Sequence, residues 1–333
     1  MVSSSFKNIW QKFILDAFVI DKIQSFIIIS PSSREAFTNP LVELITTEMN
    51  RSVKLVELPY PTEEKKPKKI PPKLKTTLKK TNPQTDAVLV FSDEGFRKHY
   101  HLTTMISSFK GLPNKTPCIS FHDLLSNQEL TKLANIDLFE IKEYTDKLLK
   151  NLKITKRVRL QTPLGTNILI TPRDWKKTPI APRFNGYVGY FPIGQVFTAP
   201  IEHLTEGKLV IDRLISEFMI DWKKKIPFPE LSDNIEIKIS NGKITKISGG
   251  KEADYLIREC LSQVTSGGTV LCELTFGTNP ISLSDANIAA EDCARDTFHV
   301  GFGENRHLGG KNNANVHWDA VIEFDQKNII YEK

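Results

Sequence analysis

The sequence has few cysteines and no long apolar run. The four cysteines are scattered and none forms a Cys-x-x-Cys pair, which argues against a disulfide framework and predicts reduced, mostly buried thiols. No apolar run reaches the ~20 residues that a helix needs to cross a bilayer, so we expect no membrane partner. The first residues lack the basic and apolar segments of a secretory signal, which favours a cytoplasmic protein.

The sequence also lacks a glycine-rich phosphate loop. Ser30–Ser33 follows the first strand that we predict, Ser25–Ser30, and contains no glycine. A dinucleotide-binding turn requires glycines at this place for a tight turn and for close approach of the backbone to phosphate. The end of this strand therefore carries no nucleotide motif.

Positive charge is concentrated in one segment. Glu63–Lys80 holds eight lysines, two glutamates and three prolines, so its net +6 accounts for the whole formal charge of the chain. The segment is compatible with a nucleic-acid or anionic-membrane patch, but it contains no arginine or aromatic residue of the kind that stacks on bases. We interpret it as a solvated, flexible loop and expect no nucleic-acid partner.

The first half of the chain alternates strands with helices. We predict strands at 25–30, 53–58, 86–91 and 117–120, with helices that include 3–20, 33–49 and 138–152. This alternation is typical of an α/β domain with a doubly wound, mainly parallel sheet. We therefore expect residues 1–153 to form a Rossmann-like domain.

The second half has a different pattern. Strands 157–161 and 166–171 are joined by a short turn, and strands 235–239 and 243–247 flank Ser240-Asn241-Gly242, a strong hairpin motif. A helix is predicted over 251–264. This order predicts an α+β domain with largely antiparallel strands over residues 154–333.

Four residues of metal-ligand type lie in three predicted strands near the end of the chain. Glu273 lies in Val270–Phe276, His299 in Thr297–Phe302, and His317 and Asp319 in Asn315–Phe324. Alternation in the last strand places His317 and Asp319 on one face, about 7 Å apart along the chain, and the apolar residues on the other. That spacing suits two ligands of one cation.

Other roles remain open for these residues. His317 and Asp319 could form a hydrogen-bonded pair near the surface, and His299 could be a satisfied core histidine. Glu273 lies among apolar neighbours, and a buried carboxylate is normally paired or binds a metal. The pattern alone leaves both interpretations in place.

Five segments carry a resemblance to a known family. They are Phe191–Pro200, Ser240–Gly250, Glu273–Pro280, His299–Asn305 and His317–Asp319. Through them, residues 157–333 resemble the aminopeptidase T family, thermophilic metallopeptidases often labelled leucyl aminopeptidases. That family belongs to a broader group that includes 2,5-dihydroxypyridine dioxygenases, from which this chain differs at the positions of Glu273 and His299.

The resemblance implies a two-domain homodimer with metal in the C-terminal domain. Peptidases of the family hold two metal ions, and Glu273, His299, His317 and Asp319 fall on their ligands. A further ligand in the family is a glutamate, but this chain has Gln195 at that position. A neutral amide offsets cationic charge poorly, so we expect one divalent ion (zinc, cobalt or iron) with Gln195 at its edge.

Three functions follow as hypotheses. The first is a hydrolase of the aminopeptidase T type acting on a peptide or small amide, with Glu273 at the metal and Glu202 or Glu304 as the base. In this hypothesis Tyr187 and Tyr190 are candidate proton donors or oxyanion stabilisers.

The second hypothesis is a mononuclear Fe(II) oxygenase, with His299, His317 and Asp319 as two imidazoles and one carboxylate. The third is a non-catalytic peptide-binding protein with a degenerate metal site. The loop Arg306–Lys311, which contains His307, joins two ligand strands and should border the site, so that Arg306 or Lys311 could bind a substrate carboxylate.

Overall fold

The computed structural model describes residues 3–58, 72–92, 115–121, 125–185, 187–216, 218–220, 224–281 and 288–332. The chain divides into two compact units. The first comprises Met1–Lys142 and Thr178–Ile193, and the second comprises Glu143–Lys177 and Gly194–Lys333. Among the described residues, no helix is both long enough and apolar enough to cross a membrane.

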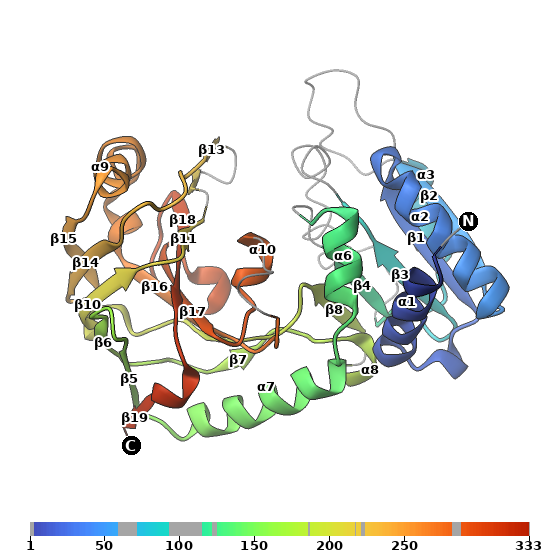
Figure 1. Ribbon diagram of the computed structural model, residues 1–333, viewed down its shortest axis with the longest axis horizontal. Helices are drawn as coiled ribbons and strands as arrows, with labels where there is room; N and C mark the ends of the chain where they lie inside the picture. Colours follow the sequence, from blue (N-terminus) through green and yellow to red (C-terminus); the bar gives the residue numbers. More distant parts are fainter. Residues whose placement is uncertain are drawn as a thin grey trace. The chain divides into compact units, whose positions relative to one another are not determined.

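The first unit is an α/β layer structure, as predicted. Its five strands are all parallel and lie in the order β2-β1-β3-β4-β8 (Figure 1). The strands are β1 (Ser25–Pro31), β2 (Ser52–Leu58), β3 (Asp86–Val90), β4 (Cys118–Phe121) and β8 (Val188–Phe191). The helices are α1 (Ser4–Ala17), α2 (Glu35–Glu43, continued by the π-helical turn Leu44–Glu48), α3 (Pro72–Lys79), α6 (Asn127–Ala134) and α8 (Pro182–Asn185).

Aromatic side chains hold this unit together. Trp10 and Phe13 of α1 are buried, and Trp10 packs edge-on against Phe37 of α2. Phe91 and Phe121, which follow or end the neighbouring strands β3 and β4, stack with ring centroids 4.4 Å apart. Burial of such large rings is the main apolar stabilisation that joins the helices to the sheet.

The lysine-rich segment is only partly described, and its described part differs from the prediction. Residues 63–71 lie outside the described part of the chain. Pro72–Lys79 forms helix α3 rather than a loop, because Leu74 and Leu78 lie four residues apart and are buried on one helical face. The surrounding lysines conceal this short apolar stripe in the sequence.

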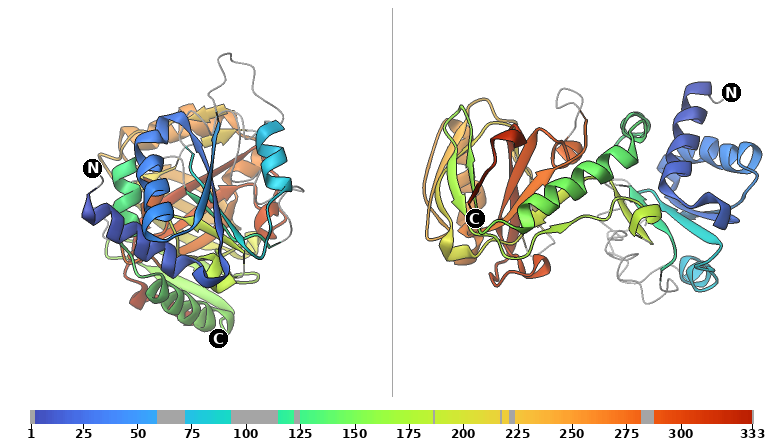
Figure 2. Two further views of the ribbon diagram at one scale, coloured as in Figure 1. Left: turned by 90° about the vertical axis from the view of Figure 1, so that its right-hand side faces the viewer. Right: turned by 90° about the horizontal axis from the view of Figure 1, so that it is seen from below.

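The second unit contains two antiparallel sheets, seen as separate layers in the right-hand view of Figure 2. Six strands form the first, in the order β15-β14-β10-β6-β5-β19, and eight form the second, with the path β13-β12-β18-β17-β16-β9-β7 and β11 beside β18. The first sheet's strands are β5 (Arg157–Gln161), β6 (Asn167–Ile170), β10 (Glu206–Ile211), β14 (Ile235–Ser240), β15 (Lys243–Ser248) and β19 (Ile330–Glu332). The second sheet's strands are β7 (Lys176–Lys177), β9 (Gln195–Thr198), β11 (Leu214–Ile215), β12 (Phe218–Ile220), β13 (Lys224–Ile226), β16 (Leu271–Gly277), β17 (Thr297–Gly303) and β18 (Val316–Glu323). The unit also contains most of α7 (Leu138–Lys153), α9 (Lys251–Tyr255) and α10 (Ile288–Glu291).

The apolar faces of the two sheets share one core. Trp318 of β18 is fully buried there and stacks on Phe302 of β17 and on Phe218 of β12, with centroids 4.4 and 4.8 Å apart. Since successive side chains of a strand point to opposite faces, His317 and Asp319 lie on the other face of the same sheet. The core packing therefore fixes which residues that outer face displays.

Residues 178–193 return to the first unit after the chain has entered the second. Within this segment β8 pairs in parallel with β4, with Cys118 opposite Val188. The two units thus differ from the predicted division at residue 153 in two places: the returning segment belongs to the first unit, and residues 143–153 belong to the second.

Candidate metal centre

The register of three adjacent strands brings the predicted ligands together. Gly301 of β17 lies opposite Glu273 of β16 on one side and opposite Asp319 of β18 on the other. His299 lies two residues before Gly301, and His317 lies opposite Gly303. A bulge between Leu271 and Glu273 interrupts the pairing of β16 at this place.

Glu273 lies between the two histidines. One of its carboxylate oxygens is 3.5 Å from Nε2 of His299, and the other is 3.3 Å from Nε2 of His317. Nε2 of His317 is also 3.1 Å from Oδ1 of Asp319. The structure thus brings together the four residues that the sequence analysis selected.

Gly301 provides the space in which these side chains meet. A Cβ atom on Gly301 would lie 2.8 Å from Cβ of Glu273 and 2.9 Å from Oδ1 of Asp319. It would also lie 3.1 Å from Cε1 of His317. The absence of a side chain at this position is therefore what allows the ligands to converge.

Hydrogen bonds orient the cluster. Thr275 donates its hydroxyl to a carboxylate oxygen of Glu273 at 2.6 Å. Nδ1 of His317 lies 2.7 Å from the backbone carbonyl of Glu304, and because a carbonyl only accepts, Nδ1 carries the proton. This arrangement directs Nε2 of His317 toward Glu273 and Asp319, which is the orientation that a metal ligand needs.

The cluster has the electrostatics of a site that exchanges protons for cations. Burial lowers the pKa of His299, but the hydrogen bond to Glu273 and the surrounding carboxylates raise it, to about 9. The pKa of His317 is likewise raised, above all by Asp319, against the effect of burial. Burial raises the pKa of Glu273, but the two histidines hold it well below its usual range. Without a metal, therefore, protons on the imidazoles balance the carboxylates.

Asp292 is a site residue that the sequence analysis missed. Its Oδ1 is buried and forms no hydrogen bond within the described part of the chain. Burial raises its pKa to about 7; the positive charge of His299 opposes this shift, and Asp319 and Glu273 add to it. Asp292 follows the short helix α10 and shows no spacing relation to the ligands, so no sequence pattern identified it.

Gln195 shares the sheet face of the cluster but uses its amide elsewhere. It lies opposite Gly277 of β16, four residues beyond Glu273, and its Nε2 donates to the backbone carbonyl of Asp292 at 3.2 Å. A carboxylate could not donate this bond. The substitution that distinguishes this chain from the peptidase pattern thus connects β9 to the segment that carries Asp292.

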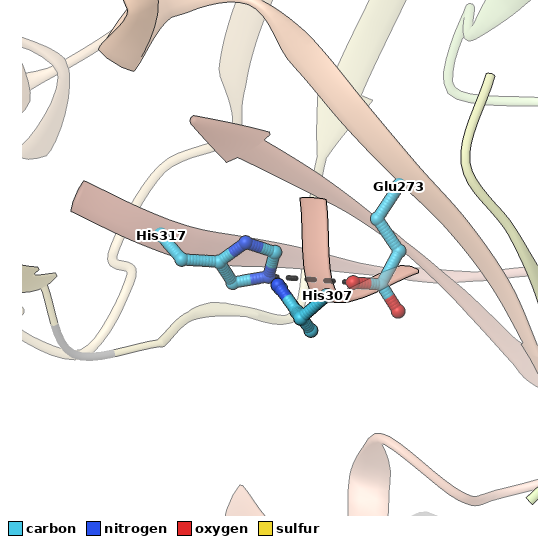
Figure 3. A group of neighbouring side chains, drawn as sticks. All are labelled: Glu273, His307 and His317. Carbon is cyan, nitrogen blue, oxygen red and sulfur yellow. Dashed lines mark ion pairs between the residues drawn. The ribbon is translucent and has the colours of Figure 1, made fainter. Parts of the chain in front are cut away.

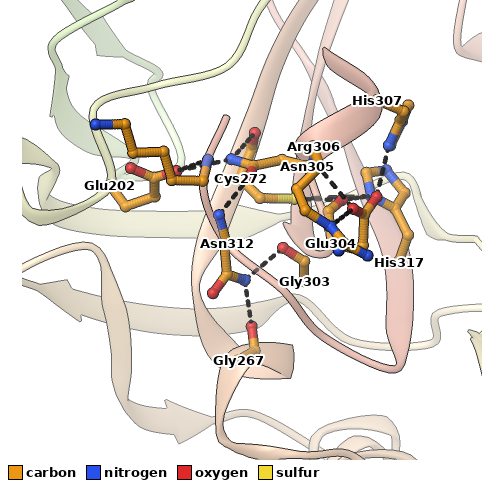
Figure 4. A network of polar contacts seen from close by, with 11 residues as sticks. Glu202, Gly267, Cys272, Gly303, Glu304, Asn305, Arg306, His307, Asn312 and His317 are labelled. Carbon is orange, nitrogen blue, oxygen red and sulfur yellow. Dashed lines mark hydrogen bonds and ion pairs between the residues drawn. The ribbon is translucent and has the colours of Figure 1, made fainter. Parts of the chain in front are cut away.

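Glu202, one of the two residues expected to act as the base, forms hydrogen bonds to the loop after β17. Glu202 accepts a hydrogen bond from Asn305 at 3.0 Å (Figure 4) and another from the backbone of Lys311 at 3.1 Å. It also pairs with Arg173 at 2.7 Å. Burial raises its pKa, but the Arg173 guanidinium and these donors lower it to about 2. Such a carboxylate is a poor proton acceptor at neutral pH, so the structure argues against Glu202 as the base.

The structure also shows the surroundings of Glu304 and Tyr187, two further residues expected to take part in catalysis. Glu304 pairs with Arg306 at 2.7 Å and with His307 at 2.8 Å, and these contacts lower its pKa although burial raises it. Tyr187 is 47% exposed and belongs to the first unit, as does Tyr190. Neither tyrosine belongs to the unit that contains the cluster.

The donor set fits a divalent cation. Oδ1 of Asp319 is buried and forms no hydrogen bond among the described residues, although Nε2 of His317 is 3.1 Å away. Ligand atoms of Glu273, His299 and Asp319 all lie within 4.8 Å of one another, as do those of Glu273, His307 and His317. Imidazole and carboxylate groups in this number suit zinc, cobalt or iron.

Comparison with solved structures supports the fold over the whole chain. The structure of 2,5-dihydroxypyridine dioxygenase from Pseudomonas putida KT2440 matches with a TM-score of 0.65 and 17% sequence identity, over 100% of this chain and 97% of the other. Wild-type AmpT from Thermus thermophilus matches with a TM-score of 0.61 and 15% identity, over 98% and 97% of the two chains. At these identities the likeness concerns the fold alone. Both groups named by the sequence resemblance thus share this architecture.

Sequence comparison assigns the family. No curated protein matches the chain. The family model described as 2,5-dihydroxypyridine 5,6-dioxygenase matches residues 133–330, which include all the strands of the metal centre. Because this match covers more than half of the chain, the chain belongs to the 2,5-dihydroxypyridine 5,6-dioxygenase family.

Proposed function

We propose that the chain is a metal-dependent hydrolase that acts on a peptide or small amide. The observation that carries this proposal is the position of Glu273, whose two oxygens face His299 and His317 separately at 3.5 and 3.3 Å. A second carboxylate, Asp319, adjoins the same space. A site with two carboxylates favours a hard or borderline cation held as a Lewis acid.

A divalent cation bound here would polarise a carbonyl group and lower the pKa of water next to it. Glu273, His299 and Asp319 would hold the cation, and the Thr275 hydroxyl would keep the Glu273 carboxylate in place. Asp292 would accept the proton of the attacking water, because its Oδ1 is buried without a hydrogen bond among the described residues and its pKa is near neutrality. This assignment replaces Glu202 and Glu304 as the base.

An iron-dependent oxygenase is the second candidate, and family membership favours it. The ligand set first considered for it, His299, His317 and Asp319, is not one of the groups whose ligand atoms lie within 4.8 Å of one another in the described chain. The group Glu273, His307 and His317 does meet this condition and also offers two imidazoles and one carboxylate. That combination is typical of mononuclear Fe(II) sites.

One experiment separates the two functions. The protein would be freed of metal with a chelator and reloaded with Zn(II), Co(II) or anaerobic Fe(II). Hydrolysis of leucyl p-nitroanilide by the zinc or cobalt form would support the hydrolase. Oxygen consumption with 2,5-dihydroxypyridine, seen only with the iron form, would support the oxygenase. If no form binds metal, both proposals fail and the peptide-binding hypothesis takes their place. The homodimer stays a prediction, to be tested by light scattering at micromolar concentration.

A further inference from the structure

We infer that His307 is a metal ligand carried by the loop after β17, and that with Glu273 and His317 it forms a second position for a divalent transition-metal ion. The ion would lie beside the position formed by Glu273, His299 and Asp319. This inference rests on the proposed metal centre and adds a ligand that the sequence analysis placed only at its border. Figure 3 shows the His307 ring directed toward His317 and Glu273.

The first argument is distance. Ligand atoms of Glu273, His307 and His317 all lie within 4.8 Å of one another, and the rings of His307 and His317 are 5.3 Å apart at their centroids. Atoms bound to one ion at about 2.0–2.2 Å lie no more than about 4.4 Å apart, so small side-chain shifts suffice to close this set around a cation. Only Glu273 belongs to both groups, and because one of its oxygens faces His299 and the other faces His317, each position could take one oxygen.

The second argument is orientation. Nδ1 of His307 lies 2.8 Å from a carboxylate oxygen of Glu304, so Nδ1 donates to this oxygen and Nε2 would be the nitrogen that binds a cation. A carboxylate behind an imidazole raises its basicity and fixes its ring, as in many zinc sites. The other oxygen of Glu304 accepts from the backbone and side chain of Arg306 at 3.0 and 2.7 Å, which keeps the carboxylate in place.

The third argument is that hydrogen bonds fix the conformation of the loop that carries His307 (Figure 4). Asn305 is fully buried and donates to Glu202 at 3.0 Å and to the carbonyl of Cys272 at 3.1 Å. Its side-chain oxygen accepts from the backbone of Asn312 at 2.9 Å. These bonds close the loop at both ends around His307, whose side chain is 45% exposed and therefore accessible to an entering ion.

The fourth argument is charge. Gln195 contributes no negative charge to the cluster, so a second ion needs compensation from elsewhere. Glu304 is the nearby carboxylate on the loop: its side chain is only 8% exposed and lies 2.8 Å from Nδ1 of His307. The second position thus involves two carboxylates. Glu273 would contact the ion directly, and Glu304 is hydrogen-bonded to the imidazole of His307.

The test is the stoichiometry and affinity of Zn(II) binding to the metal-free protein, measured by isothermal titration calorimetry and elemental analysis. We expect two ions per chain for the wild type and one for His307→Ala, with the remaining ion bound as tightly as before. Glu304→Gln keeps the carbonyl that orients His317 and should weaken only the second ion, by about 10–100-fold. His203→Ala, which removes an exposed histidine that belongs to neither ligand group, serves as the matched control and should still bind two ions.

Circular dichroism of each variant verifies the fold, and His307→Gln provides a second substitution if the alanine variant is unstable. If the wild type and His307→Ala both bind one ion with equal affinity, His307 is not a ligand, while the proposed metal centre stands. If the wild type binds no ion, the proposed metal centre and this inference both fail.

Discussion

The backbone carbonyl of Glu304 accepts a hydrogen bond from Nδ1 of His317 at 2.7 Å. The side chain of the same residue accepts from Nδ1 of His307 at 2.8 Å. Glu304 follows directly after β17, so the end of one strand orients two imidazoles at once. This double contact explains why the loop after β17, and not only the strands, determines the geometry of the site.

Gly301→Ala should abolish tight metal binding while the protein remains folded. The added methyl group would lie 2.8 Å from Cβ of Glu273 and 2.9 Å from Oδ1 of Asp319, so both ligands would have to move apart. Zinc titration followed by thermal unfolding measures both effects. Val300→Ala is the control, because Val300 is the neighbouring residue of β17 but is buried in the core. It should lose stability and keep metal affinity; equal zinc affinity in Gly301→Ala and the wild type would refute the role assigned to Gly301.

Gln195→Glu should tighten metal binding. The glutamate adds a negative charge on the sheet face that carries Glu273, at the cost of the hydrogen bond to the carbonyl of Asp292. Gln195→Ala loses the same hydrogen bond without adding charge, so it separates the two effects and should not gain affinity. Competition with a chromogenic chelator gives the dissociation constants. A glutamate variant that binds zinc no better than the alanine variant would show that position 195 does not contact the cation.

Metal affinity should rise with pH up to about 9. In the metal-free protein the pKa of His299 is raised to about 9, so at neutral pH a proton must leave before Nε2 can coordinate. The dissociation constant should fall about tenfold per pH unit for each proton displaced, since one unit of pKa corresponds to about 1.4 kcal/mol. Calorimetry in two buffers of different ionisation enthalpy counts the released protons. A pH-independent affinity without proton release would contradict the protonated state assigned to His299.

Asp292→Asn should lower the rate of amide hydrolysis by about 10²–10⁴ without loss of metal, because the amide cannot accept the proton of water. The limb of the pH–rate profile that reports ionisation of Asp292 should be absent from the profile of the Asp292→Asn variant. In the metal-free protein the pKa of Asp292 is about 7, and a bound cation would lower it. Glu291→Gln is the control, because Glu291 pairs with Arg213 at 2.9 Å. An unchanged rate in Asp292→Asn would exclude Asp292 as the acceptor.

Much of the fold follows from local patterns in the sequence. Alternation around His317 and Asp319 predicted β18 and the face that it presents, and the Asn241-Gly242 turn predicted the hairpin of β14 and β15. The segment that contains β8 was assigned to the second domain, because its pairing with β4 joins residues about 70 positions apart, and no local pattern contains that information.

The site was predictable only where ligands lie in strands. Strand periodicity placed His317 and Asp319 on one face, but Asp292 and His307 lie outside strands, and the roles proposed for them depend on tertiary contacts. His307 depends on a loop closed by Asn305 and Glu202, which are 103 residues apart in the chain. Glu202 was expected to act as a base because its partners Arg173 and Asn305 could not be seen in the sequence.

The central claim, that Glu273 is the shared ligand of a metal centre, is tested most directly by crystallography of the zinc-soaked protein with data collected at the zinc absorption edge. We predict an anomalous peak at about 2.0–2.2 Å from a carboxylate oxygen of Glu273, with Nε2 of His299 or of His317 at about 2.0–2.1 Å from the same ion. An anomalous map with no peak within coordination distance of Glu273, from crystals of protein shown to be folded and exposed to excess zinc, would contradict the account.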